Sequence, residues 1–164
     1  NWVTGDGTPV LLRPIRPEDE PLMKELLESL SGHSSYLRFF KTLKEFSHEW
    51  LAHVTQIDYD RELAMVAITQ PPFKERILGE SRLIHELTGE AAEFAIIVGD
   101  RWQGKGLGRK LLEVLIGIAR ERGIRRVNGF IMPENKNMIK LCEKLGFHKS
   151  YDRDLGTHIV EIEL

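Results

Sequence analysis

Apolar residues along the chain recur in patterns that divide it into expected strands and helices. Leu22, Leu26, Leu27 and Leu30 stand at the spacing of one helix face, while stretches 63–69 and 76–85, separated by Pro71-Pro72, are typical of a hairpin. The expected strands are 10–15, 63–69, 76–85, 92–98, 126–131, 147–151 and 158–164. The expected helices are 17–30, 34–40, 47–55, 107–122 and 135–145. Their order predicts an α/β (α+β) fold, with helices on both faces of a mixed central sheet of six or seven strands.

Several of these boundaries carry residues that begin or end helices. Glu18, Asp19 and Glu20 stand in the first turn of the first helix, where the helix dipole favours negative charge. Ser47 is a candidate N-cap. Gly123 follows an amphipathic stretch, at a place where we expect a left-handed residue to end the helix.

Composition and charge narrow the class of protein. The chain has 164 residues, 41% of them apolar and 29% charged, so we expect one globular domain, 1–164. A net charge of −2 gives no reason to expect a nucleic-acid or membrane partner. No apolar stretch is long enough to span a membrane, and no export signal opens the chain. Cys142 is the single cysteine, which excludes an internal disulfide and favours the cytoplasm. Because the chain begins at Asn1 rather than Met, we expect a fragment of a longer protein.

Three alternate glycines mark the most informative segment. An expected strand ending at Val98 leads towards Gly104, Gly106 and Gly108, and an expected helix follows at once. Glycines adopt positive φ easily and let a ligand approach the backbone closely. The N–H groups at a helix N-terminus attract anions. This segment is therefore expected to bind a pyrophosphate, with Arg109 and Lys110 helping to neutralise its charge.

Two other phosphate-binding motifs do not fit this spacing. A P-loop needs Ser or Thr after its lysine, but Gly106 follows Lys105. A Rossmann fingerprint needs Gly-x-Gly-x-x-Gly, whereas the glycines here alternate. The glycines alone do not exclude the interpretation that the turn has a purely structural role.

Two segments resemble the signatures of one family. The run Gln103-Gly104-Lys105-Gly106-Leu107-Gly108 resembles the Arg/Gln-x-x-Gly-x-Gly/Ala signature of the GNAT superfamily of acyltransferases. The stretch 135–147 resembles the family's second signature, an Asn-x-x-Ala-x-x-x-Tyr-x-x-x-Gly-Phe helix, with Met138 and Cys142 at the Ala and Tyr positions. The two signatures occur in the right order, and the element order extends the resemblance over nearly the whole chain.

The resemblance implies a GNAT-type domain that binds acetyl-CoA and needs no metal. The strand before the glycine turn resembles the family's splayed strand, whose backbone pairs with the pantetheine arm. The cofactor-binding residues implied in this way are Ile96, Ile97, Val98, Gln103, Gly104, Lys105, Gly106, Leu107, Gly108, Arg109, Asn135, Met138 and Cys142.

Acetyl transfer to an amine needs a base, because an ammonium group has no lone pair with which to attack a thioester. Glu93 is the preferred candidate, since its strand leads into the glycine turn and its neighbours Ala92, Phe94 and Ala95 favour desolvation and a raised pKa. Family members that modify protein lysines often carry a glutamate on this strand. Glu80, on the neighbouring strand, is the second candidate. The alternative that Glu93 is an exposed strand carboxylate without a catalytic role stays open.

The general acid is open, because Cys142 replaces the tyrosine that usually has this role in the family. A thiol can in principle protonate the departing thiolate of CoA. Packing on a buried helix face is the favoured interpretation of Cys142, however. In that case solvent or the amine's own proton serves as the acid.

The histidines do not predict a metal site. His48 and His53 imitate a zinc-protease helix, but they are five residues apart. Five residues turn a helix about 140° beyond a full turn, so the two rings do not converge.

Three further segments, 6–19, 35–40 and 92–95, resemble the C-terminal acetyltransferase domain of bacterial protein lysine acetyltransferases. The resemblance implies a protein substrate bearing a lysine, notably an AMP-forming acyl-CoA synthetase. It also implies an attached acyl-CoA-synthetase-like domain in the full-length chain. Two alternatives remain: acetylation of a small amine, and a non-catalytic domain that senses acyl-CoA.

Overall fold

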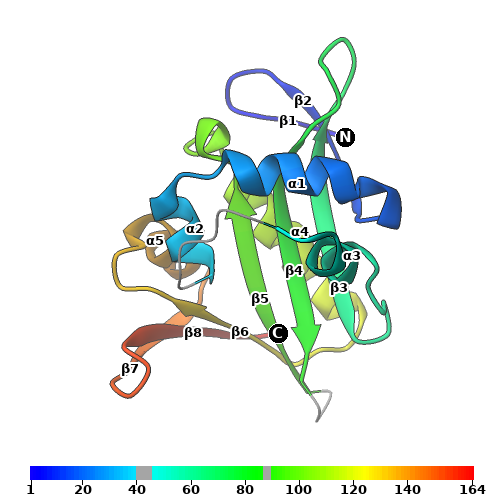
Figure 1. Ribbon diagram of the computed structural model, residues 1–164. Coiled ribbons are helices and arrows are strands. Elements are labelled where there is room, and N and C mark those ends of the chain that lie inside the picture. The colour runs from blue at the N-terminus through cyan, green and yellow to red at the C-terminus, as the bar shows by residue number, and fades with distance from the viewer. Residues whose placement is uncertain (40–45, 87–89) are drawn as a thin grey trace.

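Within the residues that the computed structural model describes, 1–39, 46–86 and 90–164, eight strands form one sheet (Figure 1). The strands are β1 (Trp2–Val3), β2 (Pro9–Pro14), β3 (Glu62–Thr69), β4 (Ile77–His85), β5 (Ala91–Val98), β6 (Arg126–Ile131), β7 (His148–Asp152) and β8 (Thr157–Glu163). Their order in the sheet is β1-β2-β3-β4-β5-β6-β8-β7. This exceeds the six or seven strands expected and is one more than the seven stretches located in the sequence. The additional strand, β1, has only two residues, too few for an apolar period to reveal it.

The sheet is mixed, as expected. β5 and β6 run parallel, and the other neighbouring pairs are antiparallel. A parallel pair needs a long crossover connection, and α4 (Leu107–Glu121) supplies it. The glycine turn lies at the start of this crossover, directly after β5.

The first three helices lie on one face of the sheet, which we call the front face (Figure 1). They are α1 (Glu20–Ser29), α2 (Gly32–Phe39) and α3 (His48–Thr55). Leu27 of α1 and Leu51 of α3 share a buried cluster with Val66 of β3. Alternate residues of β3 and β4 therefore face these helices.

The opposite face, which we call the back face, is covered by α4 and by α5 (Lys136–Lys144). Leu115 of α4 and Cys142 of α5 pack in one buried cluster with Phe94 of β5. The expectation of helices on both faces is thus confirmed. The apolar residues of α4 lie on the side of the helix that faces the sheet.

Several predicted helix bounds change in the structure. The expected helix at Pro17 is divided into a 3₁₀ turn, Pro17–Asp19, followed by α1, and a second 3₁₀ turn, Asp100–Trp102, follows β5. α2 begins at Gly32, and Phe40, its expected last residue, lies outside the described residues. Gly123 has a φ of 76° just after α4, which confirms the left-handed helix end.

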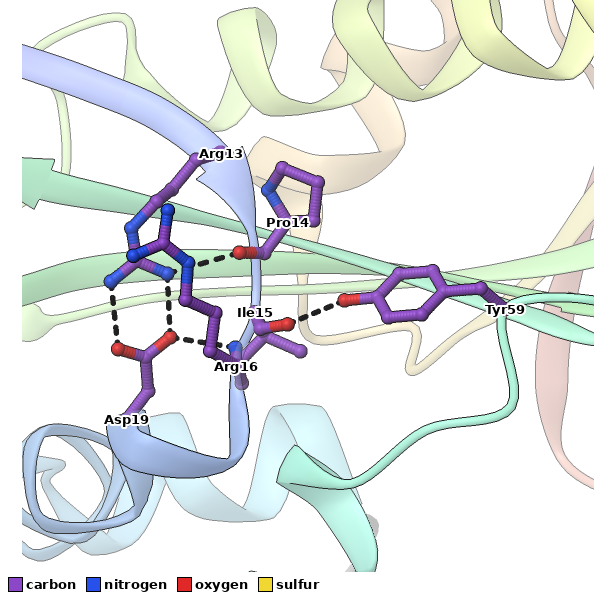
Figure 2. A network of polar contacts seen from close by, with 6 residues as sticks. All are labelled: Arg13, Pro14, Ile15, Arg16, Asp19 and Tyr59. Carbon is purple, nitrogen blue, oxygen red and sulfur yellow. Dashed lines mark hydrogen bonds and ion pairs between the residues drawn. The ribbon is translucent and has the colours of Figure 1, made fainter.

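A polar network fixes the turn between β2 and α1 (Figure 2). The Arg13 guanidinium donates to both carboxylate oxygens of buried Asp19, each at 2.7 Å. The backbone N–H of Arg16 donates to the same carboxylate at 2.8 Å, and the Tyr59 hydroxyl donates to the Ile15 carbonyl. Asp19 therefore does more than complement a helix dipole, the role expected from the sequence: it ties the start of α1 to β2.

Candidate active site

The sheet opens between β5 and β6 (Figure 1). The two strands pair over three residues only, and Glu93 and Asn128 are the last pair. Beyond Glu93, β5 continues alongside β4 while β6 continues alongside β8. This divergence gives β5 a free edge at the centre of the molecule.

The free edge of β5 presents backbone groups that no neighbouring strand uses. The N–H of Gly99 donates to the carbonyl of Leu78 on the β4 side. Hydrogen bonding alternates along an antiparallel strand, so the backbone groups of Ile96 and Val98 point away from β4. The Val98 carbonyl accepts a 3.1 Å hydrogen bond from the side-chain amide of Gln103. An extended ligand with amide groups can therefore pair with this edge.

The glycine turn continues from this edge into α4. Gly104 has a φ of 75° and Gly106 a φ of 85°, conformations that residues with a Cβ adopt with strain. Gly106 is the N-cap of α4, so the turn presents the N–H groups of the helix start. Gly108 differs from the expectation: it lies inside α4 without a positive φ. Such features are typical of a backbone cradle for anions, the role expected of this segment.

The N-terminal segment braces the glycine turn from outside. The Gly5 N–H donates to the Lys105 carbonyl at 2.9 Å, and the Lys105 ammonium lies 2.7 Å from an Asp6 carboxylate oxygen. The same ammonium lies 5.0 Å from the ring centroid of Trp102. The hydrogen bond from Lys105, helped by those from Thr4 and Thr8, holds the pKa of the Asp6 carboxyl well below its usual range.

A cleft brings both sequence signatures together. A cavity of about 480 Å³ lies between the free edge of β5, the glycine turn and the start of α5. The Asn135 side chain caps α5 by accepting from the Met138 N–H at 3.4 Å. The expected cofactor residues that line this cavity are Ile96, Ile97, Val98, Gln103, Gly104, Gly106, Gly108, Arg109, Asn135 and Met138.

Three expected cofactor residues lie outside the lining of this cavity. Lys105 turns towards Asp6. Leu107 is buried in a small cluster with Val10. Cys142 is fully buried in the back-face core.

Known proteins share both the sequence and the fold of this chain. The Acetyltransferase (GNAT) domain family matches residues 10–148. An acetyltransferase from Pseudomonas aeruginosa is 33% identical over 162 residues, which are 98% of this chain and 87% of that protein. The chain belongs to the GNAT acetyltransferase family.

Two further relatives are similar over almost the whole GNAT domain. The crystal structure of the GNAT domain of PAT from S. lividans superposes with a TM-score of 0.88, at 28% identity over 99% of this chain and 95% of that one. The acetyltransferase Pat of Mycolicibacterium smegmatis is 27% identical over 93% of this chain. The chain spans 45% of the length of Pat.

As a member of this family, the protein is an acyltransferase of the kind that uses acetyl-CoA, and its cleft fits that substrate. The positive-φ glycines and the helix start suit the pyrophosphate. The free edge of β5 suits the amide groups of the pantetheine arm. Among the described residues, no group of three or more His, Cys, Asp or Glu is placed to hold a metal ion. None of the helices in the described ranges is both long and apolar enough to cross a membrane.

Glu93 lies in a second cavity, of about 410 Å³, that continues the first. The two cavities share Arg38, Ile96 and Met138 among their lining residues. Burial raises the pKa of the Glu93 carboxyl above its ordinary value, Arg38 opposes this rise, and Glu86 adds to it. A carboxylate with a raised pKa therefore stands where the GNAT cleft continues past the free edge of β5.

Arg38 of α2 is a site residue that the sequence reasoning missed. It lines both cavities, and its guanidinium lies 4.7 Å from the ring centroid of Phe39. Burial lowers the pKa of Arg38, while the carboxylates of Glu80 and Glu93 oppose that shift. The feature of the sequence that could have indicated it is that Arg38 is the single charged residue in the stretch 35–40.

Glu80, the second candidate base, is placed differently. It is buried on β4 and accepts a 2.8 Å hydrogen bond from the Arg82 guanidinium. Arg82 in turn donates to the Val54 carbonyl at 2.7 Å. Because its carboxylate is engaged and lines neither of the two larger cavities, Glu80 is less suited than Glu93 to accept a proton from a substrate.

Cys142 is poorly suited to donate a proton. Burial raises the pKa of its thiol to about 12, with a smaller contribution from Glu143. A thiol this weakly acidic does not readily protonate a thiolate of ordinary pKa. The packing role is therefore the better interpretation of Cys142.

Proposed function

We propose that the protein transfers the acetyl group of acetyl-CoA to a lysine side chain of another protein, with Glu93 as the general base. The observation that carries the proposal is the position of Glu93. Its partly buried carboxylate lies in the cavity that continues the cofactor cleft, beside the point where β5 and β6 part. An amine entering from that side meets the carboxylate next to the expected thioester end of the cleft.

The chemistry of the acceptor explains the need for this carboxylate. A lysine ammonium has a pKa near 10.4, so it must lose a proton before its nitrogen can attack. Glu93 accepts that proton, either directly or through one water. Its raised pKa favours proton uptake, and the cation of Arg38 favours the ionised form that can act as a base. The departing CoA thiolate then takes up a proton, either from the nitrogen that attacked or from solvent.

Similarity supports a protein acceptor. The sequence resembles the acetyltransferase domain of bacterial protein lysine acetyltransferases, and the fold is similar to that of the GNAT domain of PAT. AMP-forming acyl-CoA synthetases are the proposed acceptors. The proposal also includes an attached acyl-CoA-synthetase-like domain in the full-length protein. The lone thiol of Cys142 supports a cytoplasmic location.

The proposal is tested with acetyl-CoA and a purified AMP-forming acyl-CoA synthetase. We expect new acetyl-lysine on the synthetase by mass spectrometry. Glu93→Gln should lower the rate about 100-fold or more with little change in CoA affinity. The matched control is Glu90→Gln, an exposed carboxylate three residues away and outside both cavities, which should keep the parent rate.

Two outcomes would replace the proposal by the alternatives considered above. Thiol release with polyamines or amino acids, but not with proteins, would make the protein a small-amine acetyltransferase. Tight CoA binding without turnover on any acceptor, unaffected by Glu93→Gln, would make it a sensor of acyl-CoA.

A further inference from the structure

Among the described residues, no helix packs a buried core against the front face of β6, β8 and β7, which we call the wing face. The end of α2 lines a cavity together with residues of this face. The front-face core draws its strand residues from β3, β4 and β5, and none from β6, β8 or β7. Figure 1 shows α1 and α3 in front of β3 to β5, whereas β6, β8 and β7 extend away from them. The wing face begins directly beside Glu93, because Glu93 pairs with Asn128 of β6.

The strand register places an acidic row next to Glu93. Residues paired across a sheet lie on the same face, so Glu93, Asn128 and Glu161 form one row on the front side. The Asn128 side chain donates to the carboxylate of exposed Glu86 at 3.0 Å. Glu86 and Glu161 therefore add two carboxylates near Glu93, a setting that attracts an ammonium group.

An apolar row lies immediately next to the acidic one. Phe130 pairs with Ile159 two residues along β6 and β8, so both lie on the wing face. Phe130 is 38% exposed, and Leu155, in the turn between β7 and β8, is 62% exposed. Both line the cavity that contains Glu93. The cavity thus joins a carboxylate to an exposed apolar wall.

We infer that the wing face binds the acceptor polypeptide, with an apolar residue adjacent to the modified lysine resting on Phe130 and Leu155. The inference rests on the proposed function. The acidic row matches the charge of the lysine, and the apolar row matches a neighbouring aliphatic or aromatic side chain. A polyamine would instead need a second group of carboxylates in place of Phe130 and Leu155. A second copy of the chain is the other occupant that the test distinguishes.

The test compares three acceptors that carry the same lysine side chain in different surroundings. They are a peptide with leucine on both sides of the lysine, the same peptide with serine in place of leucine, and Nα-acetyl-lysine amide. Acetylation is followed by thiol release from acetyl-CoA. We expect kcat/KM to be about tenfold higher for the leucine peptide than for the serine peptide, the size of effect that burying part of one leucine gives.

Two variants and one control locate the source of this preference. Leu155→Ser and, separately, Phe130→Ser should each reduce the preference to about twofold or less, because each lowers kcat/KM for the leucine peptide more than for the serine peptide or Nα-acetyl-lysine amide. Tyr151→Ser is the matched control. Tyr151 is 53% exposed but pairs with His158, which places it on the opposite side of the same strands. The control should keep the full preference.

The outcomes separate this inference from the function on which it rests. Equal rates for both peptides, or a preference that survives both serine variants, would overturn the inference and leave lysine acetylation standing. A uniform loss with all three acceptors would also overturn it, because it would show a structural effect. Acetylation of neither peptide would overturn the proposed function as well. A dimer in solution that Leu155→Ser dissociates would assign the wing face to a second copy instead.

Discussion

At the scale of single residues, Glu93 and Arg38 form the chemically informative pair. They come from different elements, β5 and α2, and line the same cavity. Burial disfavours the charge on each of them, while each favours the charge on the other. The ionisation of the proposed base is thus set by a balance between desolvation and a neighbouring cation.

This balance predicts the pH dependence of the reaction. Glu93 acts as a base only when ionised, so kcat/KM should fall as pH drops through its raised pKa. Arg38→Leu removes a cation that lowers this pKa, and the acidic limb of the pH profile should move to higher pH. Arg38→Lys should restore the limb, because it restores the charge. Glu86→Gln should move the limb the opposite way, since Glu86 raises the pKa of Glu93.

The position of the limb in a plot of kcat/KM against pH is the readout. Lost packing at Arg38 would change the height of the profile and not its midpoint. Identical midpoints in the parent, Arg38→Leu and Glu86→Gln would show that neither group acts on Glu93.

At the scale of elements, the glycine turn combines a strained backbone with a rigid support. Gly104 and Gly106 have positive φ, and the N-terminal segment holds the turn through Gly5 and Asp6. The N–H groups of the turn are therefore held in one arrangement before a ligand arrives. Preorganisation of this kind favours tight binding of a pyrophosphate.

The cradle predicts a specific effect of adding a side chain at Gly106. Gly106→Val forces a β-branched residue to a φ of 85° at a position that lines the cofactor cavity, with its Cβ 3.7 Å from the Trp2 ring, so the turn must shift. Loss of one hydrogen bond to a charged group should raise the Kd for CoA about tenfold or more in calorimetry. Gly117→Val is the matched control in the same helix, because a Cβ at Gly117 meets no atom within 4 Å. An unchanged Kd for Gly106→Val would remove the turn from the binding site.

The second signature also explains how the sheet is held open. The Phe94 ring packs against Gly129 of β6 so closely that a Cβ at Gly129 would lie 2.5 Å from it. Phe147, at the end of the second signature, stacks edge-on against Phe94 with centroids 5.5 Å apart. The ring of Phe94 thus fills the back side of the point where β5 leaves β6. The Gly-Phe pair of the signature supports the strand that carries Glu93.

The sequence alone predicts those features that depend on local pattern. Glycine spacing predicted the turn at Gly104 and Gly106. The strand that leads into this turn then pointed to Glu93 as the candidate base. Contacts between distant segments could not be read in the same way. Arg38 reaches the cleft only because α2 packs beside β5. Lys105 turns away from the cleft only because Asp6, 99 residues earlier, binds it.

At the scale of the whole molecule, the two halves of the sheet differ in which of their faces are packed. The half formed by β2 to β5 is packed on both faces and supports the cofactor cleft. Within the described residues, the half formed by β6, β8 and β7 has a buried core on the back face only, and its front forms one wall of the open cavity that contains Glu93. A polypeptide acceptor can lie across that open half without any rearrangement of the core. This arrangement favours a large acceptor over a molecule that must be enclosed.

The Arg13–Asp19 pair in Figure 2 predicts how the stability of the whole fold depends on pH. Burial by itself raises the pKa of Asp19, but the hydrogen bonds from Arg13 and from the Arg16 N–H outweigh it and hold the pKa below its ordinary value. A carboxylate with a lowered pKa in the folded state stabilises the fold above its unfolded pKa, near 3.9. That stabilisation is lost as pH falls from there through the lower folded pKa.

Asp19→Asn should therefore lower the free energy of unfolding by about 2 kcal/mol at pH 7, since it removes hydrogen bonds to a charged group. The difference from the parent should shrink when pH falls below about 4, because a proton then binds the Asp19 carboxylate of the unfolded parent and, at still lower pH, that of the folded parent as well. Urea unfolding followed by tryptophan fluorescence at pH 7 and pH 3 measures both values. Asp154→Asn, an exposed carboxylate in the turn between β7 and β8, is the control and should leave stability unchanged at either pH. A difference for Asp19→Asn that stays constant with pH would show that shape, and not charge, makes Asp19 stabilising.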